Sequence, residues 1–183
     1  MNTANIQIKY GKFRKITVSK WIAVTNKKNP QWADYLPINL EDGLLSSVNC
    51  KINLKSNYLR FGFKLLDRNA SVFSSVGLVN TNENNGLFHI SKEIGDYKLF
   101  SCVYKDGVLE ANPQFAVYHV QDELIKLELK IEQNNELVLK INDVKCYQST
   151  IKTQYRERLI LMAWGDGNNY ELEVSDIDVL VKI

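Results

Sequence analysis

Apolar and polar residues alternate along most of the chain from Leu124 to Ile183. Between Lys126 and Glu132 the odd positions are aliphatic and the even positions are charged. A repeat of two residues is typical of a β-strand with one face in the core and the other in water. The alternation and the short length of this segment favour a strand over the helix that residues 121–132 would also allow.

Segments of this kind recur along the chain, separated by clusters of Asn, Gly, Asp and Ser. This spacing predicts an all-β sandwich or barrel. The three prolines, Pro30, Pro37 and Pro113, fall outside the predicted strands, as expected if those strands are internal to sheets. The predicted strands are residues 5–10, 14–24, 47–54, 58–66, 72–79, 86–90, 97–104, 115–120, 124–132, 136–142, 144–151, 158–164 and 170–183.

Two connections predict the register of the strands that they join. If residues 127–131 and 137–141 share a core face, the loop between them has an odd length, and Gln133-Asn134-Asn135 fits. Such a hairpin needs a left-handed residue near its end, a conformation that Asn tolerates. For the next connection, a two-residue turn at Asn142-Asp143 predicts that Ile141 pairs with Val144 and Leu139 with Cys146.

The length and composition suit one globular domain that spans residues 1–183. The chain has a mass of 21.1 kDa, with 45% hydrophobic and 24% charged residues, so a full core is expected without disulfides or metals. The cysteines, Cys50, Cys102 and Cys146, are odd in number and widely spaced. This predicts buried free thiols in a reducing compartment and no zinc site.

The net charge is only +2, but the charges are unevenly distributed. The segment up to Pro30 carries seven basic residues and no acidic one, whereas five carboxylates and only Lys182 follow from Asp166 onward. A basic arm is one sign of nucleic-acid or membrane binding. Here apolar residues with strand spacing separate the basic ones, so we expect instead that the first and last strands are neighbours with facing charges. Neither a nucleic-acid nor a membrane partner is expected.

The first residues contain no apolar stretch of the length that a secretory signal needs. No window approaches the length of a membrane-spanning helix. The sequence therefore predicts a soluble, cytoplasmic protein. A domain cut from a secreted parent would have the same sequence.

Three segments near the end of the chain resemble the last strands of concanavalin A-like lectin and glucanase jelly rolls. They are Leu127 to Asp143, Ala163 to Tyr170 and Ile177 to Val181. In that superfamily an apolar-x-apolar-x-Asn-Gly hairpin is common and a final strand returns beside the N-terminal one; here Asp143 replaces the Gly. The resemblance implies a jelly-roll-like β-sandwich of two antiparallel sheets, in a superfamily that includes sugar-binding lectins, adhesion modules and glycosidases. Fold alone does not transfer function.

The acidic residues Glu171, Glu173 and Asp176 resemble the Glu-x-Asp-x-x-Glu strand of jelly-roll glucanases. Residues two apart on a strand share a face at roughly 7 Å, a spacing that suits paired carboxylates. The acids are exchanged in type, however, and the motif lies at the end of the chain. Apolar positions also change from even to odd near Ser175-Asp176, which predicts a β-bulge there.

The segment from Trp164 to Tyr170 is the best candidate for ligand binding. An aromatic ring beside amide and carboxylate groups suits stacking on a sugar ring with hydrogen bonds to its hydroxyls. The alternative is a plain turn with a buried Trp. Trp21 and Trp32 flank a polar stretch and are either further platforms or core anchors. The candidate ligand-binding residues are Trp164, Asp166, Asn168, Asn169, Tyr170, Trp21 and Trp32.

No cofactor is expected, because the sequence has no phosphate loop and no metal-binding motif. Asp166 and Asn168 lack the further oxygen ligands that a calcium loop needs. His89 and His119 have no nucleophile motif near them.

The sequence thus predicts a non-catalytic recognition domain that binds carbohydrate through a concave sheet face or through rim loops. The first alternative is an intracellular protein-interaction module. The second is a glycoside hydrolase that uses Glu171 and Glu173. Exposed aromatic side chains are expected for the first function, and acids in an open cleft for the last. The sequence does not specify the oligomeric state.

Overall fold

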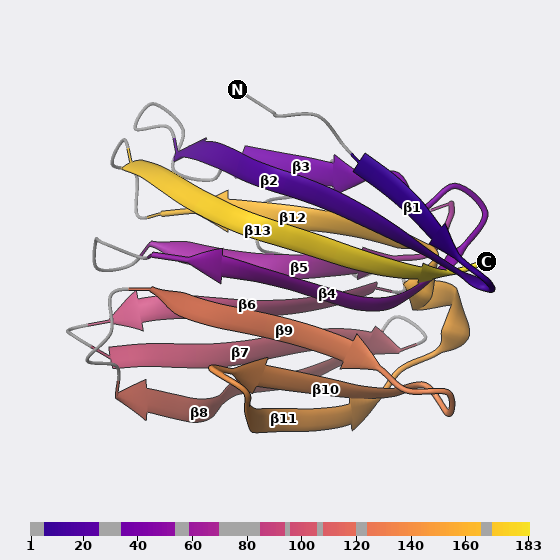
Figure 1. Ribbon diagram of the computed structural model, residues 1–183. Helices are drawn as coiled ribbons and strands as arrows, with labels where there is room; N and C mark the ends of the chain where they lie inside the picture. The colour runs from indigo at the N-terminus through magenta and orange to yellow at the C-terminus, as the bar shows by residue number, and fades with distance from the viewer. Residues whose placement is uncertain are drawn as a thin grey trace.

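Two antiparallel β-sheets lie one in front of the other in this protein, whose structure is a computed structural model (Figure 1). The structure describes the backbone of residues 6–25, 34–53, 59–69, 85–93, 96–105, 108–119, 124–165 and 170–183. The described side chains are those of residue 8 and of residues 11–24, 34–53, 59–69, 124–163, 165 and 171–183.

The front sheet has seven strands and the back sheet has six. In spatial order the front sheet consists of β1 (Ile6–Tyr10), β2 (Phe13–Thr25), β13 (Tyr170–Lys182), β4 (Leu44–Ile52), β9 (Ile125–Ile131), β10 (Glu136–Ile141) and β11 (Val144–Thr150). The back sheet consists of β3 (Asp34–Ile38), β12 (Arg158–Trp164), β5 (Arg60–Leu66), β6 (Asn85–Glu93), β7 (Asp96–Lys105) and β8 (Val108–His119). A single turn of 3₁₀ helix, η1 (Thr153–Arg156), precedes β12. The predicted fold class is confirmed.

The core lies between the two sheets and takes alternate residues from both. Val48, Leu129 and Val179 of the front sheet belong to the same buried cluster as Phe63 and Leu161 of the back sheet. Burying each such side chain stabilises the fold by roughly 1.5–3 kcal/mol. Within the described residues, no helix is long and apolar enough to cross a membrane.

The described strands agree with the predicted ones except at the edges of the back sheet. The strand β3 was missed, and Pro37 lies within it; Pro113 lies within β8, which begins earlier than predicted. Both strands are edges of the back sheet, the positions in a sheet where a residue without an N–H is best tolerated. The expectation that all prolines lie outside strands was therefore wrong. The predicted strand at 72–79 lies outside the described residues.

The hairpin between β9 and β10 has the predicted register. Ile131 pairs with Leu137, and the N–H of Glu132 donates to the carbonyl oxygen of Glu136 at 2.8 Å. Asn135 has φ 62°, the left-handed conformation expected at this place. The side-chain pattern and the turn residues together were enough to determine this hairpin.

The hairpin between β10 and β11 follows the prediction only at its turn. Asn142 and Asp143 have φ 49° and 67°, and Ile141 pairs with Val144. Leu139, however, pairs with Tyr147 and not with Cys146, because the register shifts between Leu139 and Lys140. Irregularities of this kind concentrate at sheet edges. Only one strand constrains β11, so a shift there disrupts no second ladder.

The predicted bulge in β13 is present. Ser175 pairs with Lys51 of β4, whereas Asp178 pairs with Asn49, and Asp176 has φ 49°. Buried positions change from Val174 on the near side of the bulge to Ile177 on the far side. The extra residue therefore keeps both halves of a long strand facing the core.

The last strand lies beside an N-terminal strand, as predicted, but that strand is β2 and not β1. In the front sheet β13 lies between β2 and β4, and β1 forms the edge beyond β2 (Figure 1). Lys15 pairs with Asp178 at 3.1 Å and Lys20 with Glu173 at 3.2 Å. The basic start and the acidic end of the chain therefore face each other, which confirms the structural explanation of the uneven charge.

Candidate functional site

One end of the sandwich, which we call the rim, combines the termini of strands from both sheets. In the front sheet Tyr170, the first residue of β13, pairs with Thr25, the last residue of β2. In the back sheet Trp164, the last residue of β12, pairs with Arg60, the first residue of β5, while Asp34 begins β3. We define the rim by these residues: Thr25, Asp34, Arg60, Trp164 and Tyr170. It lies at the left of Figure 1.

The predicted ligand-binding segment is therefore a connection between the two sheets. It leaves the back sheet at Trp164 and enters the front sheet at Tyr170, and for both residues only the backbone is described. Asp166, Asn168, Asn169 and Trp32 lie outside the described residues. Their roles in binding stay predictions.

Asp34 fixes the local geometry of the rim. Its Oδ2 accepts a hydrogen bond from the N–H of Val24 at 2.8 Å, and its Oδ1 accepts one from the N–H of Tyr35 at 2.9 Å. One carboxylate thus links β2 of the front sheet to β3 of the back sheet. Burial raises the pKa of the neighbouring Tyr35 phenol.

Arg60 is the charged residue of the rim with unused hydrogen-bonding capacity. Its Nε is buried and has no hydrogen-bond partner among the described residues. An unpaired buried donor is costly, and Arg60 pairs with Trp164, the residue at which the predicted binding segment begins. Arg60 was not among the predicted site residues. Its sequence signal was weak, because a basic residue at the start of a strand is common.

Trp21 is a core residue and not an exposed platform. Its side chain is 4% exposed and belongs to the buried cluster between the sheets. Two roles were predicted for Trp21, and its burial agrees with the core anchor and not with the ligand platform. The reason lies in β2, where buried positions change from Ile16 and Val18 to Trp21 and Ala23, so that residue 21 turns inward.

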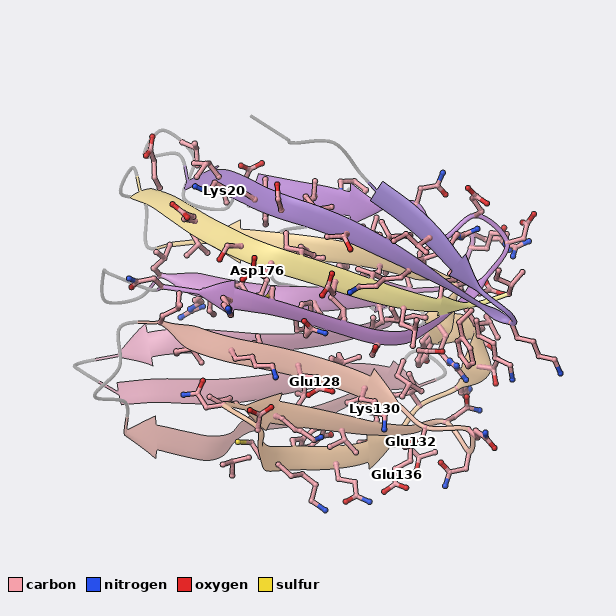
Figure 2. All side chains as sticks on the ribbon, viewed as in Figure 1. Lys20, Glu128, Lys130, Glu132, Glu136 and Asp176 are labelled. Carbon is pink, nitrogen blue, oxygen red and sulfur yellow. The ribbon has the colours of Figure 1, made fainter. Side chains whose placement is uncertain are left out.

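The acidic residues that resemble a glucanase motif lie on the open outer face of the front sheet. Glu171, Glu173 and Asp176 are all exposed. Glu173 is paired with Lys20, and Asp176 is paired with Lys51 at 3.0 Å; Figure 2 labels Lys20 and Asp176 on this face. Exposed carboxylates in ion pairs with lysines are common on ordinary protein surfaces. The roles of these three acids in catalysis stay predictions.

The outer face of the front sheet carries a polar hollow of about 490 Å³, which we call the sheet-face hollow. Its lining includes Thr17, Asn49, Lys126, Asp176 and Asp178. Thr17 Oγ1 donates to Asp178 Oδ1 at 2.8 Å. Hydroxyl, amide and carboxylate groups of this kind suit hydrogen bonds to sugar hydroxyls, but the lining contains no aromatic ring among the described residues. Thr17 and Asn49 were not predicted, because only the register of β2, β13 and β4 brings them together.

Comparison with known proteins gives a fold and no sequence family. No family model matches this sequence, and no curated protein matches it. Solved structures do match over nearly the whole chain. A carbohydrate-binding module of Bacillus subtilis covers 97% of this chain and 93% of its own length, with a TM-score of 0.54 and 8% sequence identity.

Two further solved structures match this chain to a similar degree. The carbohydrate recognition domain of Emp46p matches with a TM-score of 0.52 and 15% identity, covering 92% of this chain and 88% of its own. A prokaryotic β-1,3-1,4-glucanase (lichenase) from a mouse hindgut metagenome matches with a TM-score of 0.54 and 9% identity, covering 97% and 83%. The protein therefore has the concanavalin A-like jelly-roll fold, as its sequence predicted. Identities this low show the fold alone.

Proposed function

We propose that this protein is a non-catalytic carbohydrate-binding domain that contacts its glycan at the rim. The observation that carries the proposal is the register at the ends of β12 and β13, which join the predicted binding segment to Arg60 and Thr25. Trp164 and Tyr170 thus belong to the same end of the sandwich as Thr25 and Arg60, which are remote from them in sequence. A flat ring for stacking beside a few polar groups is the usual composition of a sugar site.

The comparisons support the same function class without proving it. The Bacillus subtilis module and the Emp46p domain both recognise carbohydrate and share this fold. The lichenase shares the fold as well and is an enzyme. The exposed, lysine-paired Glu173 favours the binding class over the hydrolase class for this chain. The sheet-face hollow is the second location at which a glycan would find hydrogen-bonding partners.

The test begins with the intact protein on a glycan array, followed by calorimetric titration of the glycan that binds. Trp164→Ala and Tyr170→Ala are expected to weaken binding by about 30-fold, the effect of removing an aromatic anchor worth roughly 2 kcal/mol. The matched control is Phe13→Ala. Phe13 is also aromatic and is 38% exposed, but it lies at the other end of β2, so its removal should leave the affinity unchanged.

The possible results separate the alternatives. If the rim variants keep full affinity and the double variant Thr17→Ala/Asn49→Ala loses it, the glycan lies on the sheet face and the rim proposal is wrong. If no glycan binds, while the protein captures a defined protein partner that the rim variants still bind, the carbohydrate proposal is wrong and the protein-interaction alternative is supported.

A further inference from the structure

A second hollow lies at the end of the sandwich opposite the rim. It has a volume of about 400 Å³ and lies between the β1–β2 turn, the β9–β10 hairpin and η1. We call it the hairpin-end hollow. The residues of its lining that matter here are Lys12, Ser46, Ser47, Glu132, Arg156 and Lys182. This end of the molecule lies at the right of Figure 1, near the C-terminus.

Arg156 lines this hollow with a guanidinium group that is almost completely buried. The residue is 6% exposed. Its Nε donates to the carbonyl oxygen of Leu45 at 2.8 Å, and its Nη1 donates to Oδ1 of Asn135 at 2.9 Å. Both partners are neutral. The position of the guanidinium is therefore fixed by hydrogen bonds, while its charge has no carboxylate partner within the described part of the chain.

The partners of Arg156 are themselves held in place. Asn135 has φ 62°, its Nδ2 donates to Thr153 Oγ1 at 2.9 Å, and its carbonyl oxygen accepts from the N–H of Ile151 at 3.0 Å. On the other side, the register of β4 shifts so that Val181 pairs with Leu45 and Leu180 with Ser47, which leaves Ser46 as the extra residue. A bulge of this kind redirects the local backbone, as often happens beside a site.

The charges around the hollow are mostly positive. Four cationic side chains, those of Lys12, Lys130, Arg156 and Lys182, line it together with one acidic side chain, that of Glu132. Glu132 is already paired with Lys130 at 2.7 Å. Figure 2 shows these two residues close together, with Glu136 beside them and outside the lining. Lys12 and Lys182 have no ion-pair partner among the described residues.

We propose that the hairpin-end hollow binds an oxyanion, a sulfate, phosphate or carboxylate group that Arg156, Lys12 and Lys182 hold from three sides. Burial disfavours the charge of Arg156 and lowers its pKa, so a bound anion would supply the missing counter-charge. A guanidinium fork matches the oxygens of such groups, and the hydroxyls of Ser46 and Ser47 add neutral donors. The proposal does not depend on carbohydrate binding at the rim.

Titration calorimetry tests the site directly. The titrants are sodium sulfate, sodium phosphate and sodium acetate, with sodium chloride as the reference salt and with the ionic strength held constant. We expect saturable binding of at least one of these anions. Lys12→Gln/Lys182→Gln should weaken it about tenfold, or about 1.4 kcal/mol. The control is Lys20→Gln/Lys51→Gln, which removes two exposed lysines of the same sheet that lie outside the hollow and already have carboxylate partners. Its affinity should stay within about twofold of the parent.

Two further arms define the ligand. Dextran sulfate compared with uncharged dextran shows whether the anion is recognised on a polymer or as a free ion. Arg156→Lys keeps the charge and removes the fork, and circular dichroism shows whether it folds; the folded variant should bind sulfate more weakly. The proposal is overturned if no anion binds better than chloride, or if the control variant loses as much affinity as the pocket variant. General stabilisation by sulfate does not count as support, because excluded salts stabilise proteins without a site.

Discussion

Gly43 shows at the scale of one residue how closely the turn before β4 packs against β13. Its N–H donates to the carbonyl oxygen of Leu40 at 3.0 Å in the turn before β4. A Cβ at this position would overlap Cγ1 of Val181 and lie 2.9 Å from the carbonyl oxygen of Lys182. The side chain of Val181 is fully buried in the core, and strands on both sides fix the backbone of β13.

Gly43→Ala is therefore expected to destabilise the fold by about 1–3 kcal/mol, the usual cost of overpacking. Urea denaturation measures this change. Gly11→Ala is the matched control, because Gly11 has φ 57° but a Cβ added there would have no heavy atom within 4 Å among the described residues. Gly11→Ala should lower the free energy of unfolding by only about 1 kcal/mol, because alanine is less stable than glycine in a left-handed backbone conformation. Equal costs for the two variants would contradict the packing explanation.

The residues of the candidate sites were predictable only where local pattern decides their environment. The burial of Trp21 was within reach, because Ile16 and Val18 occupy even positions and Trp21 and Ala23 odd ones. A separate change of parity, within β13 between Val174 and Ile177, predicted the bulge in that strand. The environment of Arg156 was not within reach, since its partners Leu45 and Asn135 come from remote parts of the chain.

At the scale of the element, the β10–β11 hairpin has a turn that its second residue does not favour. Asp143 has φ 67°, a conformation that costs any residue with a Cβ more than glycine. Its carboxylate accepts a hydrogen bond from Lys126 Nζ at 2.8 Å, and this contact lowers the pKa of Asp143. The pair therefore contributes to stability above the ordinary pKa of a carboxyl group and is lost as the pH falls through the lowered value. Both side chains are exposed, so the contribution is small.

Asp143→Gly should stabilise the protein by about 0.5–1 kcal/mol at neutral pH, because relief of the left-handed strain outweighs the loss of an exposed ion pair. The midpoint of urea denaturation measures the change. Asp143→Asn is the control: it removes the charge and keeps a residue that tolerates this conformation, so its stability should stay close to that of the parent. A glycine variant less stable than the asparagine variant would show that the turn is not strained.

The pairing of a strand was predictable where neighbouring strands constrain its register. The hairpin of β9 and β10 followed from alternation and from Asn135, because β9 has neighbours on both sides and a slipped register would expose its core face. The predicted pairing of Leu139 with Cys146 in β11 was wrong, because an edge strand tolerates a shift of register. The strand β3 was missed because it is short and contains Pro37, and only its edge position makes that proline acceptable.

At the scale of the whole molecule, the order of strands in space makes the two ends of the chain unequal. The last strand, β13, pairs with β2 along one side and β4 along the other. Five of its side chains are fully buried: Leu172, Val174, Ile177, Val179 and Val181. The first strand, β1, pairs only with β2 and forms an edge of the front sheet. The strand β13 therefore joins β2 and β4 into one sheet through contacts that are remote in sequence.

Removal of residues 170–183 is expected to abolish folding, because β2 and β4 lose their common neighbour. The core also loses five buried aliphatic side chains at roughly 1.5–3 kcal/mol each, a loss comparable to the usual net stability of about 5–15 kcal/mol. Removal of residues 1–11 takes away one edge strand and should leave a folded protein with a lower midpoint. Circular dichroism with thermal unfolding distinguishes the two results. A cooperative transition in the protein without β13 would refute the central role of that strand, since β2 would then be able to close the sheet without it.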